Sequence, residues 1–384
     1  MSRSTFSAHR LTAYTPWALA FAAALGAAPS WALSLNDSGL TQCQDASGEF
    51  TQVCQGSGQD AEFGRDTSAV DSDGAAGFRF TKVCHSGERA GHGNCPKDPA
   101  LGADVNQWGC TRDEVTGILW EIKTDDGGLR DWHHSYTHKK VEPGGDGGRF
   151  DADTFVKAVN AEGLCGHHDW QLPTPTALQS LVHYGIGPRE GVPTIDATYF
   201  PNTYYGANWS RTYAADGDSR SWFVHFDTNY VGRSDNTIYK RIRLARGDNH
   251  DAKPARYEVS ADGQEVKDLR SGLIWRRCVE GQAWDGEHCT GTPATYTWRQ
   301  ALALGDGQAA GWRLPNAKEL AWLADRTRVS PALDTAVFPD APSGKHWTST
   351  AILSTPTHAW HVEFDIGEVY RTTQKAALYA RLVR

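Results

Sequence analysis

Apolar side chains occupy every second position in two segments of the chain, residues 222–226 (WFVHF) and 360–364 (WHVEF). This spacing is typical of a β-strand that buries one face. The first, third and fifth positions of each segment should therefore face a core.

A period close to the helical repeat indicates two pairs of helices. The first pair is expected at 151–162 and just after Thr174, and the second at 297–305 and just after Asn316. The residues that should cap these helices or form their apolar faces are Asp153, Phe155, Val156 and Val159 in the first helix, Thr174, Pro175, Leu178, Leu181 and Val182 in the second, and Asn316, Glu319, Leu320 and Leu323 in the fourth.

These elements belong to one motif that the chain contains twice. From Asp196 and Asp334 onward, the two copies align without a gap at a constant offset of 138 residues. Each copy has a strand ending in tryptophan, two helices and several antiparallel strands, and its first and last strands should pair. This order predicts an α+β fold repeated in tandem. The matching segments are TGILW and SGLIW (116–120, 271–275), DWQLPTPTALQSLV and GWRLPNAKELAWLA (169–182, 311–324), NWSRT and HWTST (208–212, 346–350), and KRIRLAR and YARLVR (240–246, 379–384).

The N-terminal segment has the features of a secretion signal. Arg3 and Arg10 precede a short apolar stretch at 17–28, and small residues precede an expected cleavage after Ala32. That stretch is short for a membrane span. We therefore expect an exported protein without a transmembrane segment after signal removal, in the periplasm, outside the cell or on its outer surface.

The rest of the chain divides into four parts by composition and repeat pattern. We expect a disulfide-containing N-terminal module at 33–105, repeat domain 1 at 106–247, a polar linker at 248–256 and repeat domain 2 at 257–384. The segment 77–83 alternates like a strand, so the module should be small and β-rich, or an extension wrapped onto the first repeat.

The eight cysteines fit an exported chain. Three pairs share one spacing of eleven residues, which leaves Cys110 with Cys165. No C-x-x-C pair exists, which disfavours a thiolate zinc site. The predicted bridges are Cys43–Cys54, Cys84–Cys95, Cys110–Cys165 and Cys278–Cys289.

Charge and histidines exclude some partners and ligands. The net charge is −8 and no basic block occurs, which disfavours nucleic acid. His134 and His138 would share a face if their segment were helical, but solvated loop histidines are the simpler interpretation. Residues 71–74 (DSDG) begin like a calcium loop, yet Lys82 stands at the twelfth position; 144–148 also mixes Gly and Asp. We expect no cofactor and no metal, with calcium at an Asp/Gly loop as the alternative.

The repeated tryptophans and charged residues are expected to belong to the scaffold. Alternation directs the tryptophans into the core rather than toward a sugar, and an Arg–Asp ion pair should tie the last strand of each copy to its neighbour. These residues are Trp209, Trp222, Trp347 and Trp360, and the pairs Arg243 with Asp227 and Arg381 with Asp365.

The two copies resemble a family of exported bacterial domains, the one named for the C-terminal domain of the Legionella collagen-like adhesin. The shared features are a G-L-x-W strand, a D-W-R-L-P-T-x-x-E-L turn and helix, a W-S/T-S-T strand and a terminal V-R-x-V-R strand, over 106–384. The first copy departs at Gln171 and at Ser210-Arg211, and the second at Asn316. The resemblance implies ligand display, and the founding member is similar to binders of sulfated glycans. The acidic charge here argues against the same preference.

The R-L-P-x-x-x-E-L turn at 313–320 and the Arg-rich last strand also resemble the formylglycine-generating enzyme family. This resemblance implies two tandem C-type-lectin-like domains. That enzyme family relies on copper-binding cysteines late in its domain, whereas Cys278 and Cys289 lie early in the second copy. No catalytic constellation is recognised, so we expect no enzyme.

Ligand contacts are expected at loop positions that differ between the copies. Tyr, Asn, Arg and Asp side chains can stack on planar groups and hydrogen-bond to hydroxyls; ordinary polar loops are the alternative. The candidates are Tyr204, Tyr205, Asn208, Arg211, Asn229, Tyr230, Arg233, Asp235 and Asn236 in the first copy, and His346, Glu368, Tyr370, Arg371 and Gln374 in the second.

The sequence thus favours a secreted or cell-surface protein that binds a glycan or protein ligand, adhesin-like or lectin-like and without catalysis. Two alternatives stay open. One is a structural subunit or tip component of a surface fibre, with a fibre or oligomer partner. The other is an oxidoreductase of the formylglycine-generating type.

Overall fold

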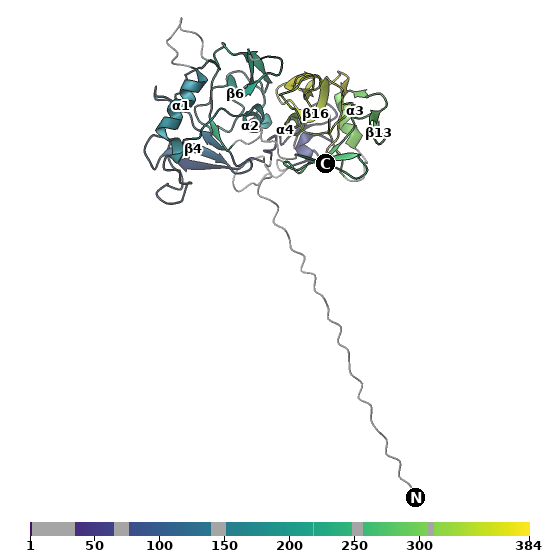
Figure 1. Cartoon of the computed structure of the whole chain (residues 1–384), viewed down its shortest axis with the longest axis horizontal. Helices are drawn as coiled ribbons and strands as arrows, with labels where there is room; N and C mark the ends of the chain where they lie inside the picture. Colours follow the sequence, from purple (N-terminus) through teal and green to yellow (C-terminus); the bar gives the residue numbers. More distant parts are fainter. Residues whose placement is uncertain (2–34, 65–76, 140–150, 218, 248–255, 306–310) are drawn as a thin grey trace. The chain divides into compact units, whose positions relative to one another are not determined.

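The computed structural model describes Met1 and residues 35–64, 77–139, 151–217, 219–247, 256–305 and 311–384. All but Met1 belong to one compact unit that begins at Ala32. The expected signal peptide, the calcium-like segments at 71–74 and 144–148, and most of the expected linker lie outside the described residues. The described fold is mainly β with few helices, in broad agreement with an α+β design (Figure 1).

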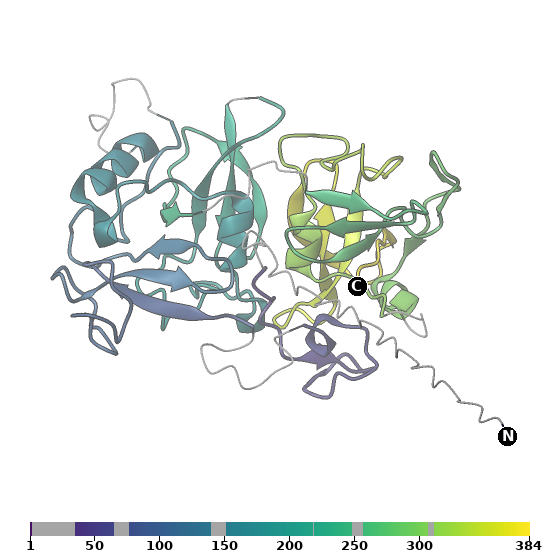
Figure 2. The ribbon, with the colours of Figure 1, turned by 60° about the horizontal axis from the view of Figure 1, so that its bottom comes forward.

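Each repeat begins with a small antiparallel sheet. In repeat 1, strand β3 comes from the N-terminal module and pairs with β4 in the register Phe80↔Asp113. In repeat 2, β10 takes the same place, with Tyr257 opposite Asp268. The module therefore contributes a strand to repeat 1 (Figure 2). The strands are β3 (Phe80–Cys84), β4 (Trp108–Asp113), β5 (Leu119–Glu121) and β9 (Ala245–Arg246), and β10 (Tyr257–Val259), β11 (Glu265–Asp268) and β12 (Ile274–Arg276).

The first and last segments of each repeat are paired, as expected. In repeat 1, β5 pairs with β9. In repeat 2, Trp275 on β12 bridges to Val383 at the chain end. Asp113 and Asp268 are equivalent, buried residues that end β4 and β11. Each closes the turn that follows its strand. Their carboxylates accept backbone N–H groups of the next residues, for example that of Val115 at 2.9 Å.

Helix α1 (Ala152–Glu162) begins two residues earlier than a cap at Asp153 implied. Asp151, not Asp153, is the N-cap, and its Oδ1 accepts from the N–H of Thr154 at 2.9 Å. The prediction of Asp153 was wrong because Asp151 is the residue held in extended backbone geometry, where a capping side chain can reach forward. The helix ends at Gly163, whose φ of 70° suits glycine.

Helices α2 and α4 begin at the expected caps. Thr174 caps α2 (Pro175–Ser180), with proline at the first helical position. Asn316 caps α4 (Ala317–Trp322) and forms a capping box with Glu319. Helix α3 spans Trp298–Leu302 and continues as the 3-10 turn η4 (Ala303–Gly305). Short 3-10 turns η2 (Leu164–Gly166) and η3 (Tyr184–Ile186) follow α1 and α2.

One eight-stranded sheet runs through both repeats, in the order β15-β19-β16-β17-β18-β8-β7-β6. The repeats meet where β18 pairs antiparallel with β8, at Val369 opposite Val231. The strands are β6 (Ala207–Tyr213), β7 (Arg220–His225) and β8 (Val231–Asp235) from repeat 1, and β15 (Thr295–Tyr296), β16 (Lys345–Ala351), β17 (His358–Glu363), β18 (Glu368–Thr373) and β19 (Leu378–Tyr379) from repeat 2.

The junction of β8 with β18, called the seam here, has local two-fold symmetry. Val231 and Val369 are equivalent residues in the two copies, and an antiparallel pair of equivalent residues lies on a two-fold axis. The flanking contacts are reciprocal. Tyr184 of repeat 1 packs edge-on against Trp360 of repeat 2 at 5.4 Å, and its equivalent, Arg326, lies 5.3 Å from Trp222. Helices α2 and α4 also contact each other (Figure 1).

The repeated tryptophans form the core, as predicted. The side chains of Trp209, Trp222, Trp347 and Trp360 are at most 1% exposed. Two of them also form an indole hydrogen bond. Trp209 Nε1 donates to the carbonyl of Tyr136 at 2.9 Å, and Trp347 Nε1 donates to that of Tyr296 at 2.7 Å. These rings are therefore unavailable for stacking on a sugar.

The cysteines form the four pairs that their spacing predicts, Cys43–Cys54, Cys84–Cys95, Cys110–Cys165 and Cys278–Cys289. The first lies in the N-terminal segment, which contains β1 (Cys43–Gln44), β2 (Phe50–Thr51) and the 3-10 turn η1 (Asp60–Glu62). Leu40 of this segment is fully buried in the same apolar cluster as Trp298 and Trp347 of repeat 2. Strands β13 (Ala283–Trp284) and β14 (Cys289–Thr290) form a hairpin around the fourth disulfide.

Candidate functional site

A small hollow in repeat 1 gathers aromatic, amide and cationic side chains from four segments of the chain. The space that it encloses is about that of one water molecule, and it opens to solvent. The four segments are the residue stretch directly after β5, the loop that contains Trp132, the stretch that leads into and begins β6, and the stretch that leads into β9. The lining residues are Lys123, Trp132, His134, Asn202, Tyr204, Asn208, Arg241, Ile242 and Arg243.

Buried cations form the floor of the hollow. Lys123 Nζ lies 2.8 Å from Glu121 Oε1, and burial lowers the pKa of Lys123 to about 8 against the attraction of that carboxylate. Arg243 donates to the carbonyl of Glu121 at 2.7 Å and to Thr203 Oγ1 at 2.6 Å. Burial lowers its pKa to about 10. Lys123 thus pairs with the Glu121 carboxylate, whereas Arg243 bonds to a backbone carbonyl and a hydroxyl, which leaves an excess of positive charge among the described residues.

An aromatic wall carries a third cation. The guanidinium of Arg241 lies 4.2 Å from the ring centre of Tyr204, a cation–π distance. Tyr205 in turn packs against Tyr204, with ring centres 4.6 Å apart. No carboxylate of the described residues lies within ion-pair distance of Arg241, and burial lowers its pKa. A flat apolar surface therefore lies beside an unneutralised guanidinium.

Several donors of the lining have no acceptor within the described part of the chain. They are Trp132 Nε1, Arg241 Nε and Arg243 Nε. The amides nearby are already positioned: Asn202 Nδ2 donates to the carbonyl of Lys123 at 3.2 Å, and Asn208 Nδ2 to that of Gly206 at 3.1 Å. Buried donors without acceptors cost free energy unless another group pairs with them. The hollow is suited to a group that offers hydroxyl or acid oxygens.

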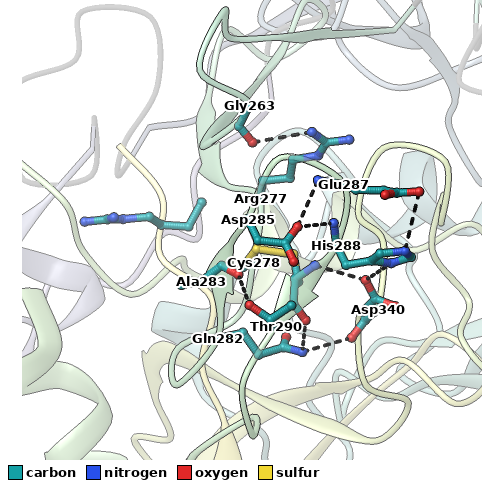
Figure 3. Close-up of a disulfide and its surroundings, with 12 residues drawn as sticks. Gly263, Arg277, Cys278, Gln282, Ala283, Asp285, Glu287, His288, Thr290 and Asp340 are labelled. Atoms are coloured by element: carbon teal, nitrogen blue, oxygen red, sulfur yellow. Dashed lines mark hydrogen bonds and ion pairs between the residues drawn. A yellow bond between two sulfur atoms is a disulfide. The ribbon is translucent and has the colours of Figure 1, made fainter.

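Repeat 2 has different residues at the corresponding positions. Cys278 stands in place of Lys123, Tyr379 in place of Arg241 and His346 in place of Asn208. The disulfide loop that begins at Cys278 folds over Asp340, the equivalent of Asn202. Figure 3 shows this contact.

In that contact, Asp340 Oδ2 accepts from the N–H of Cys289 at 3.0 Å and lies 3.2 Å from His288 Nδ1. The guanidinium of Arg277 lies 3.8 Å from the ring centre of Trp284. These residues make a docked loop. Two of the three cations of the hollow, Lys123 and Arg241, are replaced by uncharged residues in repeat 2, whereas Arg243 has an equivalent in Arg381.

Four of the expected ligand residues are buried and serve the fold. Asn208, Asn229, Asn236 and His346 are each less than 5% exposed. Asn229 adopts the left-handed turn after β7 (φ 56°), where its Oδ1 accepts from Thr194 Oγ1. The expectation of loop exposure was wrong for these residues, because turn geometry and hydrogen bonding placed them inside. Asn208 still lines the hollow.

Four others meet at the seam rather than at separate binding loops. The rings of Tyr230 and Tyr370 pack edge-to-face at 5.1 Å, and Tyr230 hydrogen-bonds to Glu368. Arg233 lies 3.8 Å from Glu368 and 2.6 Å from Asp216. These side chains differ between the copies because the two sides of the seam contribute different partners.

The remaining candidates are dispersed. Tyr205 is exposed beside the hollow. Arg211 donates to the carbonyl of Leu172 at 3.4 Å, Asp235 accepts from the N–H of Thr237 at 2.9 Å, and Gln374 donates to Gln44 at 2.7 Å. Arg371 sits on β18 opposite Trp360. Of the predicted set, Tyr204 and Asn208 line the hollow, with Tyr205 next to them.

The expected Arg–Asp ion pairs do not form. Arg243 and Arg381 are fully buried, but they donate to carbonyls of Glu121 and Arg276, each at 2.7 Å. Asp227 instead lies 2.6 Å from His225 Nδ1, and Asp365 accepts from Ser330 Oγ at 2.7 Å. The repeated arginines hold the first strand of each copy through backbone carbonyls, which a pairing of side-chain charges could not predict.

The histidine motif gives no helical metal site. Residues 132–138 are not helical; His138 is buried with Nε2 2.9 Å from the carbonyl of Ser210, and His134 lies 3.0 Å from the carbonyl of Gly128. Asp125, Asp131 and His133 do come together. The Asp131 carboxylate already accepts the N–H groups of Asp126, Gly127 and His133, and these bonds lower its pKa.

Sequence reasoning missed Lys123, Asn202 and Arg241. Lys123 and Arg241 replace Cys278 and Tyr379 of the other copy, so the signal that selected Tyr204 also marked them. They were overlooked because both lie close to repeated strand motifs rather than in an evident loop.

Comparison with protein families gives a match for each of the two repeats. The model of the Lcl C-terminal domain matches residues 109–246 and again 264–384. No curated protein matches the chain. Within the described ranges, no helix has the length and apolar character to cross a membrane. The two matches cover more than half of the chain and coincide with the two repeats, so the chain belongs to the Lcl C-terminal domain family and carries two tandem copies of that domain.

Proposed function

We propose that this protein is an exported, adhesin-like ligand-binding protein without catalytic activity, built on two C-type-lectin-like copies. The signal-like N-terminus, the four disulfides and the adhesin-related family support export and surface binding. The bonding of Cys278 to Cys289 leaves the oxidoreductase alternative with less support, because that chemistry needs reactive cysteines.

The hollow of repeat 1 is the proposed ligand seat. The single observation that carries this assignment is the convergence of unpaired donors beside an aromatic wall, Arg241 Nε and Trp132 Nε1 next to Tyr204. A sugar ring can pack against the tyrosine while its hydroxyl or acid oxygens accept from the donors. A glycan is therefore the ligand class we propose for this seat.

The test is binding of the mature, oxidised protein to a mixed glycan array, with and without calcium. We expect selective binding to one glycan class. Arg241→Ala and Tyr204→Ala should each weaken it at least about tenfold, equal to about 1.4 kcal/mol, with an unchanged melting temperature. Trp132→Phe, which removes only the indole donor, should give a smaller loss.

The matched control is Tyr370→Ala combined with Arg371→Ala, the same residue types on β18 of repeat 2. This control should bind like the parent protein. Loss of binding in the control with retention in the hollow variants would place the site at the seam instead. An array without any signal would contradict the glycan proposal.

A further inference from the structure

The start of the N-terminal segment 35–64 places a side-chain amide beside a lysine of repeat 2. Asn36 is 1% exposed, and its Nδ2 donates to the carbonyl of Ser180, the last residue of helix α2, at 3.3 Å. Lys318 of helix α4 is 4% exposed, and its Nζ donates to the same carbonyl at 2.9 Å. Because both nitrogens bond to one oxygen, the amine and the amide are neighbours inside the protein.

A buried carboxyl group contacts the same amide. Asp113 is fully buried, and its Oδ2 accepts from Asn36 Nδ2 at 2.5 Å. Its Oδ1 accepts from the N–H groups of Val115 and Thr116, at 2.9 and 3.1 Å. Amine, amide and acid therefore converge in one place, and they come from three separate parts of the chain.

The equivalent acid of repeat 2 is occupied by different groups. Asp268 Oδ2 pairs with Arg256 at 2.8 Å and accepts from Trp322 Nε1 at 2.6 Å. Ser180 stands in the place of Trp322 in repeat 1, and the smaller side chain leaves room for Asn36. Among the described residues no cation pairs with Asp113, and burial raises its pKa. Its carboxyl group is therefore suited to take up a proton and to release it again.

The surroundings shield the amine and the amide from water. Lys318 Nζ lies 4.3 Å from the ring centre of Phe78 and also donates to the carbonyl of Asp37 at 2.6 Å. Asn36 Oδ1 is buried and has no hydrogen-bond partner in the described part of the chain. A buried ammonium group is costly, and its conversion to a neutral amide removes that charge from the interior. The exclusion of water also protects the product from hydrolysis.

We propose that Lys318 and Asn36 become joined by an isopeptide bond, with Asp113 as the proton carrier. The bond that forms is Lys318 Nζ to Asn36 Cγ, and the bond that breaks is Asn36 Cγ to Nδ2. Asp113 takes the two protons that the lysine ammonium loses and passes them to Nδ2, which leaves as an ammonium ion. The charge balances, and the step needs no oxidant or other reactant.

The bond needs only a local movement and has a long-range effect. Attack requires about 3 to 3.5 Å between the reacting atoms, so Nζ must exchange the carbonyl of Ser180 for Cγ of Asn36. The flexible lysine chain can make this movement, whereas Asn36 is held by its two hydrogen bonds. The product fastens the segment that lies against helix α2 of repeat 1 to helix α4 of repeat 2.

The test is mass spectrometry of the full mature chain after oxidative folding. Under denaturing conditions the chain should be lighter than its four disulfides account for, by the mass of one ammonia. After reduction and trypsin digestion, the peptide that contains Lys318 should be joined to the one that contains Asn36, without cleavage after Lys318. Cleavage after Lys318 in the parent, with no joined peptide, would overturn the proposal whatever the variants show.

Lys318→Arg keeps the positive charge but cannot form this bond, so it should retain the ammonia. Lys375→Arg, at an exposed lysine of repeat 2, is the matched control and should lose the ammonia like the parent. Asp113→Asn should slow the appearance of joined chains after refolding at least about tenfold, and an unchanged rate would refute its role. Loss of ammonia from Lys318→Arg would come from cyclisation of Asn36 on its own backbone and would contradict the isopeptide bond.

Discussion

His361 illustrates how the two copies differ at a single core position. Its equivalent in repeat 1 is Phe223, and both side chains are buried. Among the described residues, neither ring nitrogen of His361 has a hydrogen-bond partner. Burial, aided by the charge of Lys345, lowers the pKa of His361 to about 3. The histidine is therefore a neutral, imperfectly satisfied core residue.

His361→Phe should stabilise the protein, and more so in acid. The folded pKa lies below the ordinary value near 6.5, so stability is intact above pH 6.5 and falls as the pH drops toward 3. Phenylalanine cannot take up the proton. The gain in melting temperature should be larger at pH 5 than at pH 7.5; an equal gain would contradict it. Exposed His92→Gln is the control and should change neither value.

At the scale of elements, the disulfides differ in the length of chain they close. Cys110–Cys165 spans 55 residues and ties β4 to the turn after α1, whereas Cys278–Cys289 spans 11 residues. A longer closed loop removes more entropy from the unfolded chain. The bridge within repeat 1 should therefore contribute more to stability than the bridge that shapes the hairpin of repeat 2.

Replacing both cysteines of a bridge by serine tests this difference. Loss of Cys110–Cys165 should cost about 4 kcal/mol of unfolding free energy, and loss of Cys278–Cys289 about 3 kcal/mol. Urea unfolding monitored by tryptophan fluorescence gives both values. A larger cost for the short loop would show that native contacts, rather than chain entropy, dominate.

Prediction from the sequence succeeded best for individual helices, strands and disulfides. The strands at 222–226 and 360–364, the caps Thr174 and Asn316 and the pairing of cysteines follow from local periodicity, side-chain chemistry and spacing. Such features depend on neighbours close in the chain. The cap at Asp151 differed because two nearby aspartates could each serve and only backbone geometry distinguishes them.

The site was less accessible to sequence reasoning for a long-range reason. Arg241 meets Tyr204, and Tyr230 meets Tyr370, across distances in sequence that no local pattern encodes. Copy-to-copy differences selected Tyr204 at the hollow and Tyr230 and Tyr370 at the seam alike. They could not distinguish a side chain that varies because it lines a hollow from one that varies because the seam is filled by unlike partners.

At the scale of the whole molecule, the seam and the N-terminal segment 35–64 make the two repeats depend on each other, because that segment bonds to Tyr184 of repeat 1 and to Lys318 of repeat 2. Arg326 donates to the carbonyl of Gly367 at 3.1 Å and to Thr176 Oγ1 across the seam at 3.2 Å, while covering Trp222. Burial lowers its pKa to about 10. We expect the parent protein to unfold in a single calorimetric transition, since neither copy loses these contacts alone.

Arg326→Ala should weaken this coupling by about 2 kcal/mol, the cost of leaving buried partners unsatisfied. Differential scanning calorimetry should then resolve two transitions or one markedly lower transition. Arg328→Ala removes an exposed arginine of the same loop and should leave the profile unchanged. An unaltered profile for Arg326→Ala would show that the repeats are coupled by other contacts.

The pairing of Val231 with Val369 protects two strand edges, one from each repeat, from pairing with other molecules. Without its partner, β8 or β18 would be a bare sheet edge, and such edges recruit strands from other molecules. Fusing two copies in one chain lets each copy cover the other's edge permanently, at any concentration. If the chain were cut between the repeats, β8 and β18 would each become a sheet edge that can pair with a strand of another molecule. Aggregation would then compete with folding.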